Sequence, residues 1–97
     1  MNIKIPNVYV INNHLTEVTV GDIHVFYSYG APIVLKNFSN GKREILLDPV
    51  AIGYSKTTDK DRCYVLAESI KDTKKKIESG EYKMCNLNDP EFKIELD

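Results

Sequence analysis

The sequence predicts an α+β fold, in which a curved, mostly antiparallel β-sheet built as a meander is followed by one long α-helix and C-terminal strands. Apolar and polar residues alternate through most of residues 7–48, which is the period of half-buried strands. The period lengthens to that of a helix over residues 57–80, and alternation returns over 82–87 and 92–96. Because the strands are segregated from a single helix, we expect this helix to cover one sheet face or the end of a small barrel.

Turn signals delimit the strands of the first half. Residues 16–20 alternate between apolar and polar side chains, and Gly21 then marks a tight turn. Pro32 suits the start of a strand, where its missing N–H does little harm. Asn40 and Gly41 predict a hairpin loop, so an antiparallel meander is expected over 16–48. The expected strands are 7–11, 16–20, 23–29, 33–36 and 43–48, with a possible short strand at 50–54.

One continuous helix is predicted over residues 58–79. Thr58 is a suitable N-cap, and Gly80 is a suitable residue just beyond the C-terminal end. The lysines at 74–76 mark a solvated face. Residues at helical spacing that we expect to face the core are Cys63, Leu66, Ala67, Ile70 and Ile77.

Length and charge narrow the class of protein. At 97 residues the chain is expected to form a single domain over residues 1–97, and its net charge of −1 argues against bulk attraction to nucleic acid or to an anionic membrane. No apolar run approaches the ~20 residues that a membrane-spanning helix needs. No export signal is recognised at the N-terminus, so a cytoplasmic protein with reduced Cys63 and Cys85 is expected.

No motif for catalysis, for a metal or for a phosphate group stands out. His14 and His24 lack a partner at metal-ligand spacing. Asp48, Asp59 and Asp61 are better explained as cap and turn residues than as a cation site. We therefore predict no enzymatic activity, no cofactor and no metal.

The aromatic stretch at 23–29 supplies the candidate binding residues. On a strand, Val25 and Tyr27 point to one face, which we expect to be core, while Phe26 points to the other. Two interpretations of Phe26 stay open: its ring is exposed and binds a partner, or the helix covers it. The predicted partner-binding residues are Phe26, His24, Lys36 and Tyr29.

Two stretches carry a resemblance. FYSYGAPIVL (26–35) and YSKTTDKDRCYVL (54–66) together resemble small phage-encoded proteins of uncharacterised function, in which an SYxxP strand precedes a YSxTT turn that opens a helix. Those proteins usually carry a basic residue or a histidine after the two threonines, whereas Asp59 follows them here. The resemblance implies a phage origin and a host-cell cytoplasmic location more than it implies an activity.

The sequence is compatible with three functions. The first is a small phage-type accessory protein that binds another protein, of host or phage, and in its most specific form inhibits a host defence or metabolic protein; the acidic residues at 89, 91, 95 and 97 and an exposed aromatic would serve it. The second is a single-stranded nucleic-acid binder, which the charge balance disfavours. Its contact residues would be Phe26, Tyr27, Tyr29, Lys36, Lys42 and Arg43. The third is a virion or assembly component that forms homo-oligomers through a sheet edge.

Overall fold

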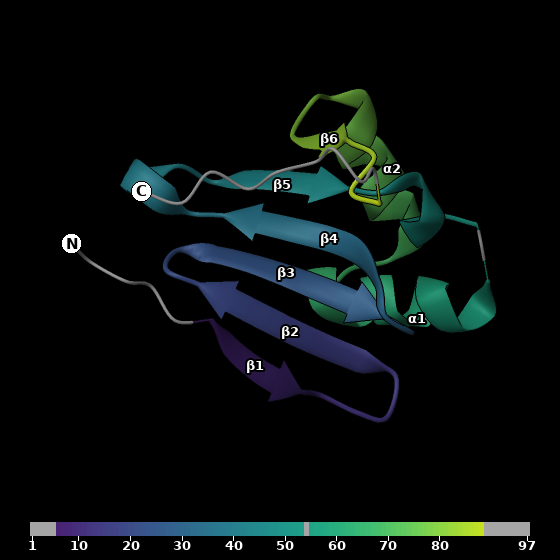
Figure 1. Ribbon diagram of the computed structural model, residues 1–97. Coiled ribbons are helices and arrows are strands. Elements are labelled where there is room, and N and C mark those ends of the chain that lie inside the picture. The colour runs from purple at the N-terminus through teal and green to yellow at the C-terminus, as the bar shows by residue number, and fades with distance from the viewer. Residues whose placement is uncertain (1–5, 54, 89–97) are drawn as a thin grey trace.

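The computed structural model, which describes residues 6–53 and 55–88, has the predicted α+β architecture (Figure 1). Six strands form one sheet in the order β1-β2-β3-β4-β5-β6. Each pair of neighbours from β1 to β5 is antiparallel, and β6 runs parallel to β5. The strands are β1 (Asn7–Val10), β2 (Leu15–Val20), β3 (Ile23–Ser28), β4 (Ala31–Asn37), β5 (Glu44–Leu47) and β6 (Tyr82–Met84), and the helices are α1 (Lys56–Leu66) and α2 (Ile70–Glu78).

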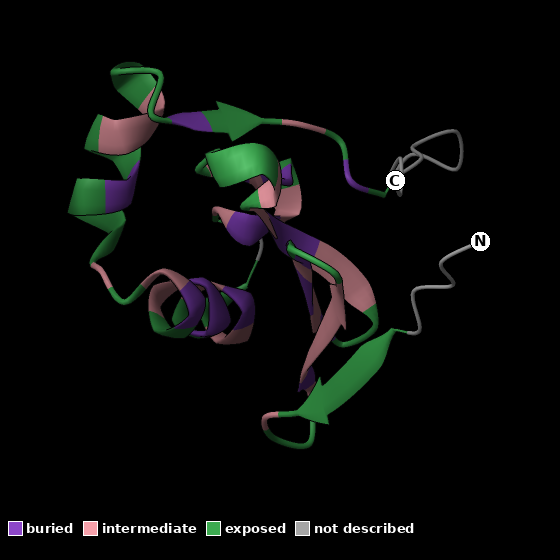
Figure 2. Cartoon of the chain, turned by 90° about the vertical axis from the view of Figure 1, so that its left-hand side faces the viewer, coloured by how far each residue is buried: buried purple, intermediate pink, exposed green. Residues whose placement is uncertain are grey.

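Both faces of the central strands are buried, each in its own cluster. On one face, Phe26 and Val34 pack in a cluster with Val65 of α1, on the side of the sheet where both helices lie (Figures 1 and 2). On the other face, Val25 packs in a cluster with Leu87, from the segment after β6. The expectation that Val25 belongs to a core is therefore confirmed, but the helices cover the opposite face.

The prediction of one long helix is wrong, because the chain breaks it between Leu66 and Ile70. Ala67 adopts a left-handed conformation (φ 55°) and donates its N–H to the carbonyl of Cys63, which ends α1. Ser69 then accepts a hydrogen bond from the N–H of Asp72 and begins α2. The first helix also begins earlier than predicted, with Ser55 rather than Thr58 as its N-cap.

The break changes which helix residues face the core. Helix α1 buries Thr58, Asp61, Arg62 and Val65, rather than the predicted Cys63 and Ala67. Leu66 and Ile77 are half-buried against the helix-side cluster, whereas Ile70 is exposed. Because a new helix restarts the phase, a single period fitted across 58–79 could not predict both buried faces.

Two further segments differ from the expectation. The short strand expected at 50–54 is wrong over its described residues, because Pro49–Ala51 forms a 3₁₀ turn that begins at Asp48. The side chain of Asp48 accepts hydrogen bonds from the N–H groups of Val50, at 2.8 Å, and Leu87, at 2.7 Å. The strand expected over 82–87 is confirmed for Tyr82–Met84, and the one expected at 92–96 lies outside the described residues.

The connection from β3 to β4 is a tight turn with an unusual occupant. Tyr29 (φ 52°) and Gly30 (φ 80°) both have positive φ, as the two central residues of a type I′ turn require. The register of β3 on β4 shifts between Phe26 and Tyr27, where Pro32 lies opposite Tyr27. Because proline has no N–H to donate, an irregular register is expected beside it.

The buried position of Phe26 leads to a stability prediction. Replacing Phe26 by alanine removes a 7% exposed ring from the helix-side cluster, so the free energy of unfolding should fall by about 3 kcal/mol or more. The control Val8→Ala, at a side chain that is 61% exposed, should change it by less than about 0.5 kcal/mol. Urea unfolding measures both, and similar small effects would show that Phe26 is not part of the core.

Candidate functional site

Phe26 is buried and cannot contact a partner directly. Its ring is 7% exposed and lies in the helix-side cluster, which is the second of the two interpretations left open by the sequence. The Nζ of Lys36 lies 5.2 Å from the centre of this ring. Phe26 is therefore positioned to hold the helices on the sheet rather than to contact another molecule.

Lys36 and His24 also make contacts within the chain. The Nζ of Lys36 donates a hydrogen bond of 2.9 Å to the carbonyl of Val65, in the last turn of α1, where a cation is favourable. Burial of this ammonium group lowers the pKa of Lys36, although the nearby charge of Glu17 acts in the opposite direction. The Nδ1 of His24 lies 2.8 Å from a carboxylate oxygen of Glu17, and its ring is edge-on to Phe38.

The neighbours of Glu17 change the pKa of its carboxylate. Burial would raise the pKa of Glu17, but hydrogen bonds from His24 and Thr19 outweigh it, and the pKa lies below its ordinary value. These contacts join β2 and β3 on the helix side of the sheet. His24 and Lys36 therefore form part of the internal polar framework of the fold.

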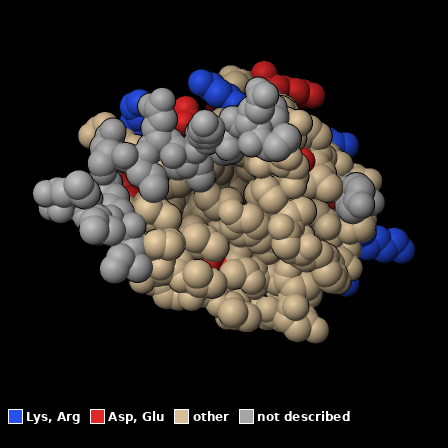
Figure 3. Space-filling model, viewed as in Figure 1, with Lys and Arg blue, Asp and Glu red and all other residues tan. Residues whose placement is uncertain are grey.

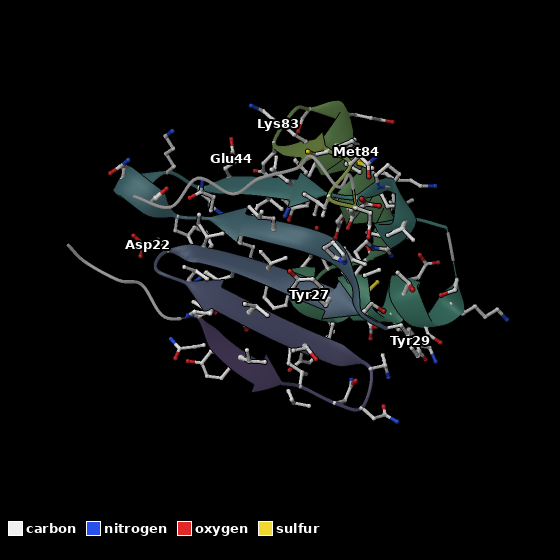
Figure 4. All side chains as sticks on the ribbon, in the orientation of Figure 1. Asp22, Tyr27, Tyr29, Glu44, Lys83 and Met84 are labelled. Carbon is white, nitrogen blue, oxygen red and sulfur yellow. The ribbon has the colours of Figure 1, made fainter. Side chains whose placement is uncertain are left out.

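Tyr29 is the one predicted binding residue that is strongly exposed, at 67%. Its ring stacks on His14, with 4.9 Å between the ring centres. A bulky side chain at positive φ is uncommon, so the turn holds this tyrosine at a conformational cost. Figure 4 shows Tyr29 beyond the end of β3 beside α1, whereas Tyr27 lies over the front of the sheet, so the two tyrosines do not share one surface.

A cluster that the sequence did not predict lies beside Tyr29. The buried carboxylate of Asp61, on α1, lies 2.9 Å from Nε2 of His14 and accepts a 2.7 Å hydrogen bond from the hydroxyl of Ser28. These three residues come from α1, the β1–β2 connection and β3, so the cluster fastens α1 to the sheet. The expectation that Asp61 is a cap or turn residue is wrong, because its side chain faces the sheet.

This cluster does not have the geometry of a hydrolase triad. In a triad the histidine lies between the nucleophile and the acid and takes the proton of the nucleophile. Here Asp61 lies between Ser28 and His14, so the serine hydroxyl donates to the carboxylate. A pocket of about 320 Å³ opens alongside, and its lining residues include Ser28, Tyr29, Ser55 and Thr58.

A second polar network joins α2 to β6. The carboxylate of Glu68 accepts hydrogen bonds from Thr73, at 3.0 Å, and from the ammonium group of Lys76, at 2.6 Å. Burial would raise the pKa of Glu68, but hydrogen bonds from Lys76, Tyr82 and Thr73 outweigh it, and the pKa falls below its ordinary value. Hydrogen bonds with Glu68 and, to a lesser extent, with Tyr82 raise the pKa of Lys76.

The surface most unlike the rest of the molecule is the face opposite the helices. The strand register aligns one row of aliphatic residues across five strands: Val8, Val18, Val25, Leu35 and Leu46. Leu87 covers the β3–β4 part of this face, and burial decreases from there toward β1. We call the less covered part the open face, and its residues are Val8, Val10, Thr16, Val18, Val20 and Tyr27.

The open face carries little charge. Figure 3 shows a broad front surface of uncharged side chains over β1 to β3, with Lys and Arg placed mainly toward its margins. Exposure is greatest at its β1 side, where Val8 is 61% and Val10 is 75% exposed. The sequence signal for this surface was present in the alternating valines of residues 16–20 and 7–11, but alternation alone does not tell a covered face from an open one.

Two further observations bear on function. Within residues 6–53 and 55–88, no group of three or more His, Cys, Asp and Glu side chains is placed to hold a metal ion. Among the helices of the same residues, none is long and apolar enough to cross a membrane.

The Asp61 cluster leads to a second prediction. Asp61→Ala removes the acceptor of the buried Ser28 hydroxyl and the partner of His14, so the free energy of unfolding should fall by about 2 kcal/mol. Asp72→Ala, at an exposed carboxylate in the first turn of α2, should cost about 0.5 kcal/mol. Chemical denaturation compares the two variants, and equal losses would mean that the cluster does not fasten α1.

The lowered pKa of Glu68 leads to a third prediction. A carboxylate whose pKa is lower in the folded than in the unfolded state stabilises the fold above the unfolded pKa, and this contribution disappears as the pH falls through the folded pKa. Denaturant midpoints of the wild type should therefore drop as the pH falls below about 4.5, and Glu68→Gln should drop less. Glu78→Gln, at an exposed residue that ends α2, should follow the wild type; identical profiles for all three proteins would contradict the assignment.

Comparison with known proteins supplies no relative from which a function could be transferred. A scan against protein-family models, a search of curated proteins and a search of solved structures each found no match.

Proposed function

We propose that this chain is a non-enzymatic protein-binding protein whose contact surface is the open face of the sheet. The observation that carries the proposal is the row of aliphatic side chains that crosses the sheet and is left more exposed toward β1. Soluble proteins rarely leave a large contiguous apolar patch in contact with water unless it serves an interaction. Binding of another protein would remove this surface from water.

The chemistry of the face indicates what kind of partner it fits. Its residues are valines, a threonine and Tyr27, without Asp, Glu, Lys or Arg. Such a surface is complementary to an apolar patch of another protein, because charged groups brought against it would lose their hydration without gaining a partner. Tyr27 adds an aromatic ring with a polar hydroxyl, a residue type enriched at the centre of interfaces.

The more specific form of the proposal is a phage-type accessory protein that inhibits a host defence or metabolic protein in the cytoplasm. Its support is the resemblance of residues 26–35 and 54–66 to phage-encoded proteins. The acidic residues at 89, 91, 95 and 97, which were expected to contribute to binding, lie outside the described residues. Of the predicted binding residues, Tyr29 alone is strongly exposed, and it lies at a different corner from the open face.

The nucleic-acid alternative is disfavoured by the way its residues are distributed. Binding a single strand requires aromatic rings and cations along one groove. Tyr27 lies on the open face, whereas Lys36 lies on the helix side and donates to the carbonyl of Val65. A fluorescent oligothymidine should therefore show no saturable binding at micromolar protein, and tight binding that weakens steeply with salt would reverse this ranking.

The proposal is tested by placing a charge on the open face. The tagged wild type should retain at least one protein from a bacterial lysate in moderate salt, and Val18→Lys should retain much less of it, because a buried lysine would lack a partner. Tyr64→Lys is the matched control, since Tyr64 is a 66% exposed apolar residue on α1. It should retain the same protein as the wild type.

Folding of the variants is checked by circular dichroism and thermal melting. Thr16→Lys is a second variant on the same face, for use if Val18→Lys lowers the melting temperature strongly. Equal capture by all variants, or no capture by the wild type, would contradict the proposal that the open face binds another protein.

A further inference from the structure

The strand β1 forms one edge of the sheet, and within the described residues β2 alone pairs with it. All four of its residues are exposed, and Figure 2 shows the strand exposed along its length. Val8, Tyr9 and Val10 are 61%, 54% and 75% exposed. An edge strand presents backbone N–H and C=O groups that another strand can pair with.

The hairpin identifies which backbone groups face this edge. The N–H of Ile11 donates to the carbonyl of Leu15, on β2, at 2.9 Å. Along an antiparallel strand, successive residues direct their backbone groups alternately to one neighbour and to the other. Tyr9 therefore points its N–H and C=O toward β2, and Val8 and Val10 point theirs away from the sheet.

This edge lacks the features that usually prevent edge-to-edge pairing. Natural edge strands carry charges, a proline or a bulge, or are covered by another element. Residues 7–10 contain no charged residue and no proline, and their register with β2 is regular. The opposite edge differs: β6 has three residues, includes Lys83 and lies against α2.

We propose that β1 pairs with β1 of a second copy of this chain, antiparallel and across a two-fold axis perpendicular to the sheet. The outward groups of Val8 then bond those of Val10 of the second copy, and the reverse pair follows by symmetry. The axis passes between the two copies of Tyr9, which lie directly opposite each other. The two sheets thereby join into one continuous sheet.

A second copy is the occupant that the strand itself specifies. A two-fold axis brings each residue close to its own counterpart, so a charged strand would place like charges together. Residues 7–11 carry no charge, so the pairing of two copies brings no like charges together. The pairing also brings together valines that are more than half exposed and two tyrosine rings on one face, a favourable cross-strand pair.

The mass of the purified protein in solution tests the pairing. Sedimentation velocity should give a species of twice the 11.1 kDa chain mass, increasingly populated as concentration rises. The double variant V8K/V10K places lysines opposite lysines and should sediment as the monomer. Met84→Lys, at a 43% exposed residue of the opposite edge, should dimerise like the wild type.

A cysteine at position 9 tests the register. In a non-hydrogen-bonded antiparallel pair the Cα atoms lie about 4.5 Å apart, which is within the range that a disulfide spans. Tyr9→Cys should therefore form a covalent dimer on mild oxidation, seen on a non-reducing gel. Val10→Cys lies opposite Val8 and should link no more than the wild type, whose native cysteines provide the background.

Three outcomes would overturn the pairing. They are a wild type that stays monomeric up to submillimolar concentration, a dimer that persists in V8K/V10K, and equal linking of Tyr9→Cys and Val10→Cys. These measurements use the purified chain alone, so their result is independent of whether the open face binds another protein.

Discussion

The arrangement of both layers of this molecule depends on one buried carboxylate, that of Asp48. One of its oxygens accepts from the N–H of Val50 and begins the 3₁₀ turn that leads from β5 toward α1, on the helix side. The other accepts from the N–H of Leu87, from the segment that covers the opposite face. A buried carboxylate requires such partners, because an unpaired charge in the interior is costly. The side chain of Asp48 thus connects the segment that leads to the helices on one face with the segment that covers the other face.

The helices cover more of one sheet face than the segment around Leu87 covers of the other, so part of the second face remains exposed as the open face. The helices bury side chains of β3, β4 and β5 together with Leu15 at the start of β2, whereas on the other side Leu87 packs over β3 and β4. The aliphatic row nevertheless continues through Val18 to Val8, at the uncovered end of the sheet. The sheet is therefore patterned for burial across a greater width than the described segments cover.

Period-two alternation and turn signals allowed β1 to β5 and the antiparallel meander of residues 16–48 to be predicted, because each of these strands carries its own local signal. The parallel pairing of β6 with β5 joins segments far apart in the sequence and was not predicted. The break at Ala67 has no comparable signal, since alanine is a strong helix former and adopts positive φ rarely. The side of the sheet that each helix covers is set by long-range packing. For that reason the sequence left two positions open for Phe26, and the exposed one is wrong.

The candidate site was less predictable than the fold, because α1 buries polar residues. Asp61 and Arg62 both face the interior, where Asp61 contacts Ser28 and Arg62 donates to the carbonyl of Ala51. Apolar residues at helical spacing predicted Cys63 and Ala67 as core residues, and this pattern does not include polar residues such as Asp61 and Arg62. The Nε of Arg62 is buried and has no hydrogen-bond partner among the described residues.

The open face and the β1 edge meet at Val8 and Val10, so the two proposed interactions are geometrically linked. A two-fold axis perpendicular to the sheet leaves both open faces on the same side of the joined sheet. The open face of one copy then continues across the axis into that of the other, because Val8 of one copy lies opposite Val10 of the second copy in the proposed pairing. A partner with two apolar patches would bind such a dimer through both, and its second contact would form at a high effective concentration. Dimerisation through β1 would therefore strengthen the binding of such a partner to the open face, although each open face would make the same contacts as in the monomer.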